Sequence, residues 1–212
     1  MKIFVIHYKK LIKRKLFILK QFEKYNISDY EFIEIDRDEL YEHNISMFQE
    51  NYHNSQIAIS LSHFYAYKQI SDNYDNGFII EDDAIFSDNF TDILNKYMSQ
   101  LPKDYDMLFI GDGCKLHIEN DKLNPNQNIY EKCLYPTSWG GDGATRCCDS
   151  YIISKKCANK LCEYINNLEY KINFEIDWWL NVAARDNNFK VYWAEPTIVT
   201  QGTQNGLFTS SH

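Results

Sequence analysis

Three consecutive carboxylates interrupt an apolar run in the segment GFIIEDDAIF, residues 77–86. Because neighbouring acids repel one another, Glu81, Asp82 and Asp83 must either be solvated or bind a cation. In a strand, Glu81 and Asp83 would share one face and Asp82 would point to the other. Two carboxylates on one side supply half of a Mg²⁺ or Mn²⁺ site. The alternative is an exposed acidic turn or an N-cap for the following helix.

Strands and helices that could position these acids alternate along the chain, which predicts an α/β layered fold. We expect strands at 2–8, 30–37, 78–83, 105–113, 148–154 and within 189–201. We expect helices at 11–26, 54–74, 87–101, 155–165 and 173–188, with Ser55 and Asn173 as N-caps. In open α/β sheets the ligand crevice lies at the carboxyl ends of strands, where the acidic cluster falls.

Two segments lack a clear period. Residues 114–146 read as an irregular loop, a length that is often functional in a compact domain. The tail, residues 202–212, is small and polar and is expected to be flexible. With no internal repeat and no low-complexity linker, we expect residues 1–212 to form a single domain.

The distribution of charge limits the partners. A formal net charge of −8 excludes nucleic acid as the main partner, because phosphate backbones need a basic face. Basic residues nevertheless crowd the N-terminal segment: Lys9, Lys10, Lys13, Arg14, Lys15 and Lys20. That segment would suit a diphosphate or peripheral contact with an anionic membrane, or else it forms a solvated helix face.

Cysteine usage and hydropathy give no sign of secretion. None of the six cysteines forms a CxxC pair or stands at zinc spacing with histidine, so we expect free thiols. No apolar run reaches the roughly 20 residues of a membrane span. The first residues also lack the features of a signal peptide, and a cytoplasmic location is therefore expected.

Several segments together resemble glycosyltransferase family 25, the family of lipooligosaccharide-building and collagen-modifying sugar transferases. They are VIHYKKLIKRK, ISLSHFYAYKQI, GFIIEDDAIF, YDMLFIG, DSYIISKKCANKL, INFEIDWWL and PTIVTQGTQNGLFTSS, in this order over most of the chain. The chain departs from the family pattern at His7, where Asn is usual, and residues 114–146 match no family segment. The resemblance implies a glycosyltransferase A-type fold, an α/β/α sandwich around a mixed, mostly parallel sheet.

The resemblance also implies a function. Such enzymes move a sugar from a nucleotide diphosphate donor to an acceptor hydroxyl, so we expect a hexosyltransferase that uses a UDP-sugar and Mn²⁺ or Mg²⁺. The acceptor would be a glycan, a lipooligosaccharide or a collagen-like hydroxylysine, and the reaction would be inverting. The alternative is a noncatalytic carbohydrate- or partner-binding domain with the same fold. A phosphohydrolase fits less well, because further acids and histidines at matching strand ends are missing.

Roles carry over to individual residues from the family pattern. Asp83 would hold the metal, Glu81 would contact the metal or the donor ribose, and Asp82 would help in donor binding or point away. Arg14 would give a cationic contact to the leaving diphosphate. Asp177, with Glu175 second, would be the base that accepts the acceptor's proton, although acids at a helix start also suit its dipole.

Other residues would contact the donor or the acceptor. These are His63, Asp112, Gln201 and Gln204, with Ser210 and Ser211 added if the tail folds over the donor. A buried core histidine and a simple turn are the alternatives for His63 and Asp112. Of Trp178 and Trp179, one would stack on a sugar ring and the other would lie in the core. Residues 136–146 would form a mobile lid.

Overall fold

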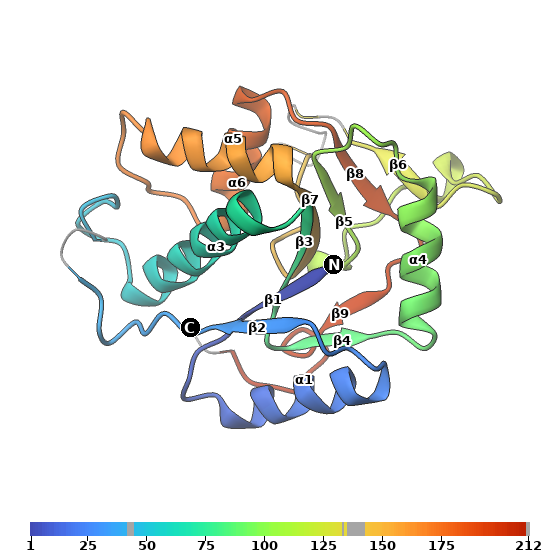
Figure 1. Ribbon diagram of the computed structural model, residues 1–212, viewed down its shortest axis with the longest axis horizontal. Helices are drawn as coiled ribbons and strands as arrows, with labels where there is room; N and C mark the ends of the chain where they lie inside the picture. Colours follow the sequence, from blue (N-terminus) through green and yellow to red (C-terminus); the bar gives the residue numbers. More distant parts are fainter. Residues whose placement is uncertain (42–44, 133, 135–142, 211–212) are drawn as a thin grey trace.

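A seven-stranded sheet forms the centre of the computed structural model, which describes residues 1–41, 45–132, 134 and 143–210 (Figure 1). The strands stand in the order β2-β1-β3-β7-β5-β8-β6. Their bounds are β1 Lys2–Ile6, β2 Tyr30–Ile33, β3 Asn76–Glu81, β5 Met107–Phe109, β6 Ile129–Glu131, β7 Ser150–Ser154 and β8 Val191–Ala194. Strands β6 and β7 run opposite to the other five, so the sheet is mixed and mostly parallel, as expected.

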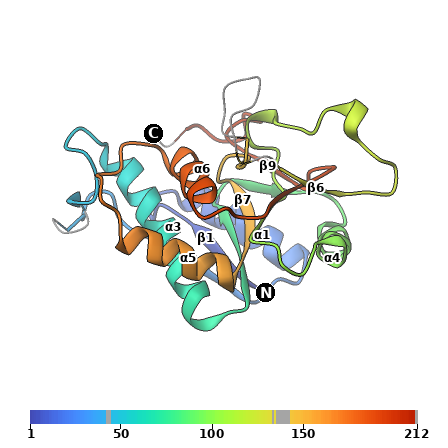
Figure 2. The same ribbon diagram turned by 90° about the horizontal axis from the view of Figure 1, so that it is seen from above.

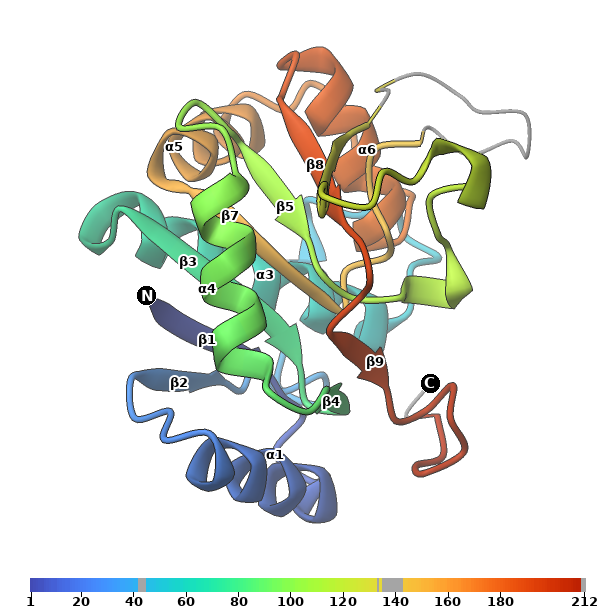
Figure 3. The ribbon, with the colours of Figure 1, turned by 90° about the vertical axis from the view of Figure 1, so that its right-hand side faces the viewer.

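Helices cover both faces of the sheet, which confirms the expected layered α/β architecture. One face carries α3, α5 and α6, and the other carries α1 and α4 (Figures 2 and 3). The bounds are α1 Ile12–Lys24, α3 Asn54–Asn73, α4 Phe90–Gln100, α5 Lys155–Asn166 and α6 Ile176–Asp186. Two single-turn 3₁₀ helices, η1 Gly113–Lys115 and η2 Asn120–Lys122, follow β5.

Strand β1 shows why these sequences form a sheet that is buried on both sides. Ile3 and Val5 join the core under α1 and α4, whereas Phe4 and Ile6 join the core under α3, α5 and α6. All four side chains are buried, and a continuous apolar run is typical of a strand with helices on both faces. This packing fixes the register of β1 against its neighbours.

Both N-cap predictions are wrong by two residues. The cap of α3 is His53 rather than Ser55, because the backbone carbonyl of His53 already accepts from the N–H of Ile57 at 3.0 Å. Helix α6 begins after Glu175 rather than Asn173. Ile172 forms an isolated β-bridge with Phe48, which keeps this stretch extended and delays the helix.

The segment predicted to be irregular contains a strand. β6 pairs antiparallel with β8 at the edge of the sheet, with Tyr130 opposite Trp193. Three residues are too few to show the alternation by which a strand is detected in a sequence. Residues 135–142, which include most of the predicted lid, lie outside the described residues, as do Cys133 and Ser211.

The direction of the strands determines which residues meet at one edge of the sheet. The carboxyl ends of β1, β3 and β5 lie together at this edge, and the reversed strand β7 brings its amino end there. Accordingly, the backbone N–H of Glu81, at the end of β3, donates to the carbonyl of Asp149, just before β7, at 2.9 Å. Groups from four strands therefore converge at the end of the acidic run.

Candidate active site

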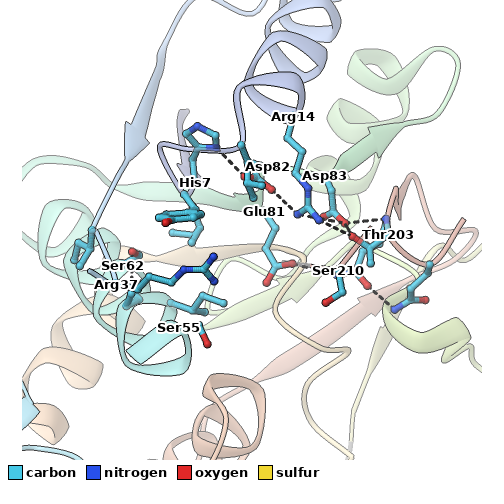
Figure 4. A pocket seen from close by; sticks show the side chains of 18 residues that line it. His7, Arg14, Arg37, Ser55, Ser62, Glu81, Asp82, Asp83, Thr203 and Ser210 are labelled. Atoms are coloured by element: carbon cyan, nitrogen blue, oxygen red, sulfur yellow. Dashed lines mark hydrogen bonds and ion pairs between the residues drawn. The ribbon is translucent and has the colours of Figure 1, made fainter. Parts of the chain in front are cut away.

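The acidic triplet turns at the end of β3 instead of continuing as a strand. Glu81 is the last residue of β3, and Asp82 and Asp83 form the turn into β4, Ala84–Phe86 (Figure 4). The expected strand alternation therefore stops at Glu81 and does not govern the two aspartates. Asp82 and Asp83 are 4% and 2% exposed, which excludes the solvated acidic turn as an explanation.

Asp82 is held by two basic side chains. One of its oxygens lies 2.7 Å from Nδ1 of His7, and the other accepts from Nη1 of Arg14 at 2.9 Å. Asp82 therefore neither points away nor lies open to solvent. His7, the departure from the family pattern, follows β1 and reaches Asp82 across the β1–β3 pair.

Arg14 is buried and links the acidic turn to the C-terminal segment. Besides Asp82, its guanidinium donates to the hydroxyl of Thr203 at 3.1 Å and to the carbonyl of Thr209 at 2.7 Å. Its Nη1 is 4.0 Å from Oδ2 of Asp83, and the ring of Phe208 lies 5.4 Å from the guanidinium carbon. Arg14 thus places a positive charge between the two aspartates.

The C-terminal segment packs on the turn, and the expectation of a flexible tail is wrong for residues 202–210. Strand β9, Val199–Gln201, pairs with β4, and Gly202 donates its backbone N–H to the carbonyl of Asp83 at 2.8 Å. The ring of Phe208 contacts Phe17, with ring centroids 5.4 Å apart. Strand pairing and an aromatic contact order a segment whose composition alone favours disorder.

Asp83 has one occupied oxygen and one without a partner. Its Oδ2 accepts from the backbone N–H of Thr203 at 2.9 Å and from the Thr203 hydroxyl. Its Oδ1 is buried, and no described group donates to it. A buried carboxylate oxygen without a donor is costly unless a ligand or cation completes it. Thr203 is a site residue that the sequence did not reveal.

The acids border a first cavity of about 240 Å³. Its floor carries Glu81, Asp82 and Asp83, and Arg14 and Arg37 add positive charge (Figure 4). The guanidinium of Arg37 lies over the ring of Tyr8 at 4.1 Å. The remaining lining is apolar or small and includes Ile6, Leu11, Ile35, Ala58, Ile59 and Ser62. The cavity therefore combines an aromatic and apolar wall with a charged end.

Three further predicted donor residues also line the first cavity: Gln201, Gln204 and Ser210. Gln201 donates to Oε2 of Glu81 at 3.2 Å, and Gln204 donates in turn to the side-chain oxygen of Gln201. Gln201 therefore supports the acidic cluster directly through a hydrogen bond, and Gln204 supports it through Gln201. Strand β9 and the turn after it supply this support.

A second cavity of about 680 Å³ adjoins the first and contains both predicted catalytic acids, Glu175 and Asp177. Glu81 and Gln201 line both cavities and form part of a shared wall. Glu175 accepts from Nε2 of Gln56 at 2.8 Å. Asp177 accepts from the N–H of Trp178 at 2.8 Å. The start of α6 thus presents two carboxylates to a space next to the acidic turn.

Partial burial raises the pKa of Asp177, and the neighbouring charge of Glu175 adds to the effect. A carboxylate with a raised pKa is a better proton acceptor near neutral pH.

Trp179 is buried in the core against Phe64, while Trp178 is 45% exposed and lines neither cavity. The expected core tryptophan is therefore Trp179.

His63 and Asp112 do not line either cavity. His63 is fully buried under the sheet, where Nδ1 lies 2.7 Å from the hydroxyl of Tyr151, and burial lowers its pKa to about 3. It is a core histidine, and the predicted donor contact is wrong because α3 turns this side chain toward the sheet. Asp112 follows β5, and its Oδ1 is buried without a described donor.

Asp149 is a buried acid that the sequence did not single out. Gly111 leaves room for it, because a Cβ at position 111 would lie 2.1 Å from Oδ2 of Asp149. That oxygen accepts from the Ser150 hydroxyl at 3.1 Å, while Oδ1 has no described donor. Burial raises the pKa of Asp149 to about 7, with a smaller contribution from Asp112.

Replacing Asp149 with Asn is expected to flatten the dependence of stability on pH. The raised pKa means that the folded chain binds this proton more tightly than the unfolded chain. The stabilisation of the fold by the bound proton is complete below pH 3.8 and is lost as the pH rises to about 7. Between pH 5 and 8, the free energy of unfolding of the wild type should therefore fall by on the order of 3 kcal/mol more than that of the variant.

Urea unfolding at both pH values measures this difference. Asn can keep the hydrogen bond from Ser150, so the variant is expected to fold. Equal losses of stability in the two proteins would show that Asp149 does not hold a proton in the folded state.

The carboxylates are close enough to affect one another. Burial raises the pKa of Glu81 well above its ordinary value, and the charges of Asp83 and then Asp149 raise it further. Within the described residues, no group of three or more His, Cys, Asp or Glu side chains is arranged to hold a metal ion. Mg²⁺ and Mn²⁺ sites in nucleotide-binding proteins commonly need only one or two carboxylates, since phosphate and water complete the shell. Glu81 and the unpartnered Oδ1 of Asp83 fit that requirement.

The basic N-terminal segment does not support membrane contact. Three of its lysines pair with nearby acids: Lys9 with Asp36, Lys10 with Asp38, and Lys15 with Glu34. Together with the burial of Arg14, these pairs reduce the uncompensated charge on which binding to an anionic surface depends. Among the helices described, none has the length and apolar character needed to cross a bilayer.

The fold is of the α/β class, and a charged cavity lies at the carboxyl edge of its mixed sheet, where open α/β sheets generally bind ligands. The family model for glycosyltransferase family 25 (LPS biosynthesis protein) matches residues 1–178. The chain belongs to this family, and its architecture is the one expected of a glycosyltransferase A-type fold.

Two curated relatives come from Acanthamoeba polyphaga mimivirus. A procollagen lysyl hydroxylase and glycosyltransferase is 26% identical over 125 residues, which are 54% of this chain and 13% of that protein. A putative glycosyltransferase, R655, is 27% identical over 140 residues, which are 62% of this chain and 42% of that protein. The chain thus matches less than half the length of either relative.

Among solved structures, a mutant Drosophila β1,4-galactosyltransferase 7 in complex with manganese, UDP-Gal and xylobiose is similar, with a TM-score of 0.46. It is 14% identical, and the match covers 93% of this chain and 66% of that one.

Proposed function

We propose that this chain is a metal-dependent hexosyltransferase that moves a sugar from a UDP-sugar to an acceptor hydroxyl, with inversion. Membership of the family supports transfer of a sugar. The observation that carries the proposal is the pair of cavities that meet at Glu81 and Gln201. One has the charges suited to a nucleotide diphosphate, and the other has carboxylates suited to an acceptor hydroxyl.

The first cavity would take the donor. Tyr8 and the apolar side chains at its wall offer stacking and contact area for a base and ribose. Arg14 and Arg37 provide positive charge for the diphosphate, and Glu81 with Gln201 would contact the sugar where the cavities join. Arg14 is already oriented by Asp82, so little side-chain entropy would be lost when a phosphate binds.

Asp83 and Glu81 would hold the metal, Mn²⁺ or Mg²⁺. When bound, the metal would offset the negative charge that develops on the leaving diphosphate. Nη1 of Arg14, 4.0 Å from Oδ2 of Asp83, places a positive charge beside that carboxylate. Thr203 fixes one oxygen of Asp83, so the other is oriented for a ligand.

The second cavity would take the acceptor, a glycan, lipooligosaccharide or collagen-like hydroxylysine. Asp177 would accept the proton of the attacking hydroxyl, and Glu175 is the second candidate. The hydrogen bond from the N–H of Trp178 orients the Asp177 carboxylate and leaves its other oxygen for the acceptor. We also propose that residues 1–212 form a single domain and that the protein is cytoplasmic.

Release of UDP tests the proposal. The protein is incubated with a panel of UDP-sugars and Mn²⁺, with and without EDTA, and free UDP is measured. We expect release with at least one donor, its loss in EDTA and its return when Mn²⁺ is added in excess. A candidate acceptor, such as a collagen-like peptide or a lipooligosaccharide, should raise the rate.

A noncatalytic binding domain is the second candidate, because Asp82 and Oδ2 of Asp83 are already satisfied within the chain. Binding of UDP without release from any UDP-sugar, measured by calorimetry beside the release assay, would favour that candidate. If UDP neither binds nor is released, both candidate functions are contradicted.

A further inference from the structure

Two cysteines touch at the wall of the second cavity. Sγ of Cys147 lies 3.5 Å from Sγ of Cys114, and both residues line the cavity next to Asp177. Cys114 is exposed and Cys147 is half-buried. All five described cysteines are free thiols. The contact brings together residues that are 33 positions apart in the sequence.

The backbone holds these two thiols close. A Cβ on Gly113 would lie 2.0 Å from the carbonyl oxygen of Arg146 and 3.0 Å from Cβ of Cys147, so only glycine permits this approach. A disulfide needs sulfur atoms about 2.05 Å apart, which is roughly 1.5 Å closer than they are now. Neither cysteine belongs to a β-strand, so closing this gap requires no change in the sheet.

We propose that Cys114 and Cys147 are a thiol modification site that forms an intramolecular disulfide with a low-molecular-weight disulfide, such as oxidised glutathione, as oxidant. Cys114 gives its proton to solvent and attacks one sulfur of the oxidant, which forms a mixed disulfide and releases one glutathione thiolate. Cys147 then loses its proton and attacks the Cys114 sulfur, which releases the second glutathione. In total, the two cysteine thiols lose two electrons to the glutathione disulfide, and the two released protons end on the two glutathione thiols.

The environments of the two thiols determine the order of these steps. Exposure makes Cys114 the thiol that the oxidant can reach. Burial raises the pKa of Cys147, and the adjacent Cys114 adds to the effect, so Cys147 attacks second and only within the mixed disulfide. Proximity compensates for its low thiolate fraction, because the second step is intramolecular.

The thiol pair connects with the acidic cluster through two glutamines. Nε2 of Gln204 donates to Sγ of Cys114 at 3.5 Å and also to the side chain of Gln201, which donates to Glu81 at 3.2 Å. A disulfide would move the Cys114 sulfur toward Cys147 and away from Gln204. We expect this to change the wall shared by the two cavities, a consequence that rests on the proposed function.

Peptide mapping tests the covalent part directly. The reduced protein is equilibrated with oxidised and reduced glutathione at pH 8, the remaining thiols are alkylated, and the chain is digested with trypsin. We expect residues 104–115, which contain Cys114, to be linked to residues 147–155, which contain Cys147. Dithiothreitol should separate the two peptides, and fragmentation should place the link on Cys147 rather than on Cys148.

Matched variants sharpen this experiment. Cys114→Ser and Cys147→Ser should each abolish the link, whereas Cys162→Ser should retain it. The proposal is wrong if wild-type Cys114 stays alkylated to the same extent as Cys162, carries only glutathione, or links to Cys133 or Cys148. These outcomes are read on wild-type protein, so they do not depend on whether a variant folds.

Kinetics test the connection with the acidic cluster. In the disulfide form, the KM for the acceptor should change several-fold, recover after reduction and show no such redox response in Cys114→Ser. An unchanged KM in the linked protein would overturn the connection. If the peptides are linked but neither the reduced nor the disulfide form releases UDP, the disulfide is supported and the proposed function is contradicted. The failure of one proposal can therefore be distinguished from the failure of the other.

Discussion

Replacing Asp83 with Asn is expected to lower kcat/KM for UDP release by about 100- to 1,000-fold. The carboxylate provides the one buried oxygen of the acidic turn, Oδ1, to which no described group donates. Asn keeps the shape and an oxygen that can accept from Thr203, but it removes the negative charge that would hold the metal. The Mn²⁺ concentration needed for half-maximal activity should rise in the variant.

Asp88→Asn is the matched control for this substitution. Asp88 lies five positions further along and is 93% exposed, and it lines neither cavity. Its substitution should leave activity and metal dependence unchanged. Thermal unfolding of both variants separates a loss of chemistry from a loss of fold. Full activity of Asp83→Asn with an unchanged Mn²⁺ requirement would refute the metal assignment.

Asp177→Asn is expected to lower kcat by about 100- to 10,000-fold, the range for loss of a general base. The UDP-sugar should still bind with similar affinity, because Asp177 lines only the second cavity. In the wild type, activity should fall as the pH drops through the pKa of Asp177, since its protonated form accepts no proton. Burial raises that pKa, so this fall should lie above pH 3.8 and should be missing in the variant.

A control for Asp177→Asn is available on the same helix. Asp186, at the last position of α6, lines neither cavity, and Asp186→Asn should retain kcat. If Asp177→Asn keeps the wild-type kcat and pH profile, Glu175→Gln becomes the decisive variant. Activity in both variants would show that neither acid accepts the proton.

Local patterns were enough to predict the layers of the fold. Continuous apolar runs mark strands that are buried on both faces, and helical periodicity marks the helices that cover them. The acidic triplet could be placed at the end of β3 because the chain changes there from apolar to charged. Its neighbours Gln201 and Gln204 were expected from the family resemblance, and they line the same cavity.

Contacts between distant segments were beyond the reach of these patterns. Asp149 lies beside Glu81 only because β7 runs antiparallel to β3, and nothing in residues 148–154 indicates the direction of that strand. Thr203 reaches Asp83 through the pairing of β9 with β4, which depends on two strands of three residues each. His63 has the residue type of a ligand-binding side chain, but the rotation of α3 places it in the core.

The wall that Glu81 and Gln201 give to both cavities has a thermodynamic consequence. Under the proposed function, the donor in one cavity and the acceptor in the other would each contact and order these two hydrogen-bonded side chains. Whichever molecule arrives first meets the entropy cost of that ordering, and the second one does not. Cooperativity of this kind is reciprocal, so the donor and the acceptor would each tighten the binding of the other by an equal factor.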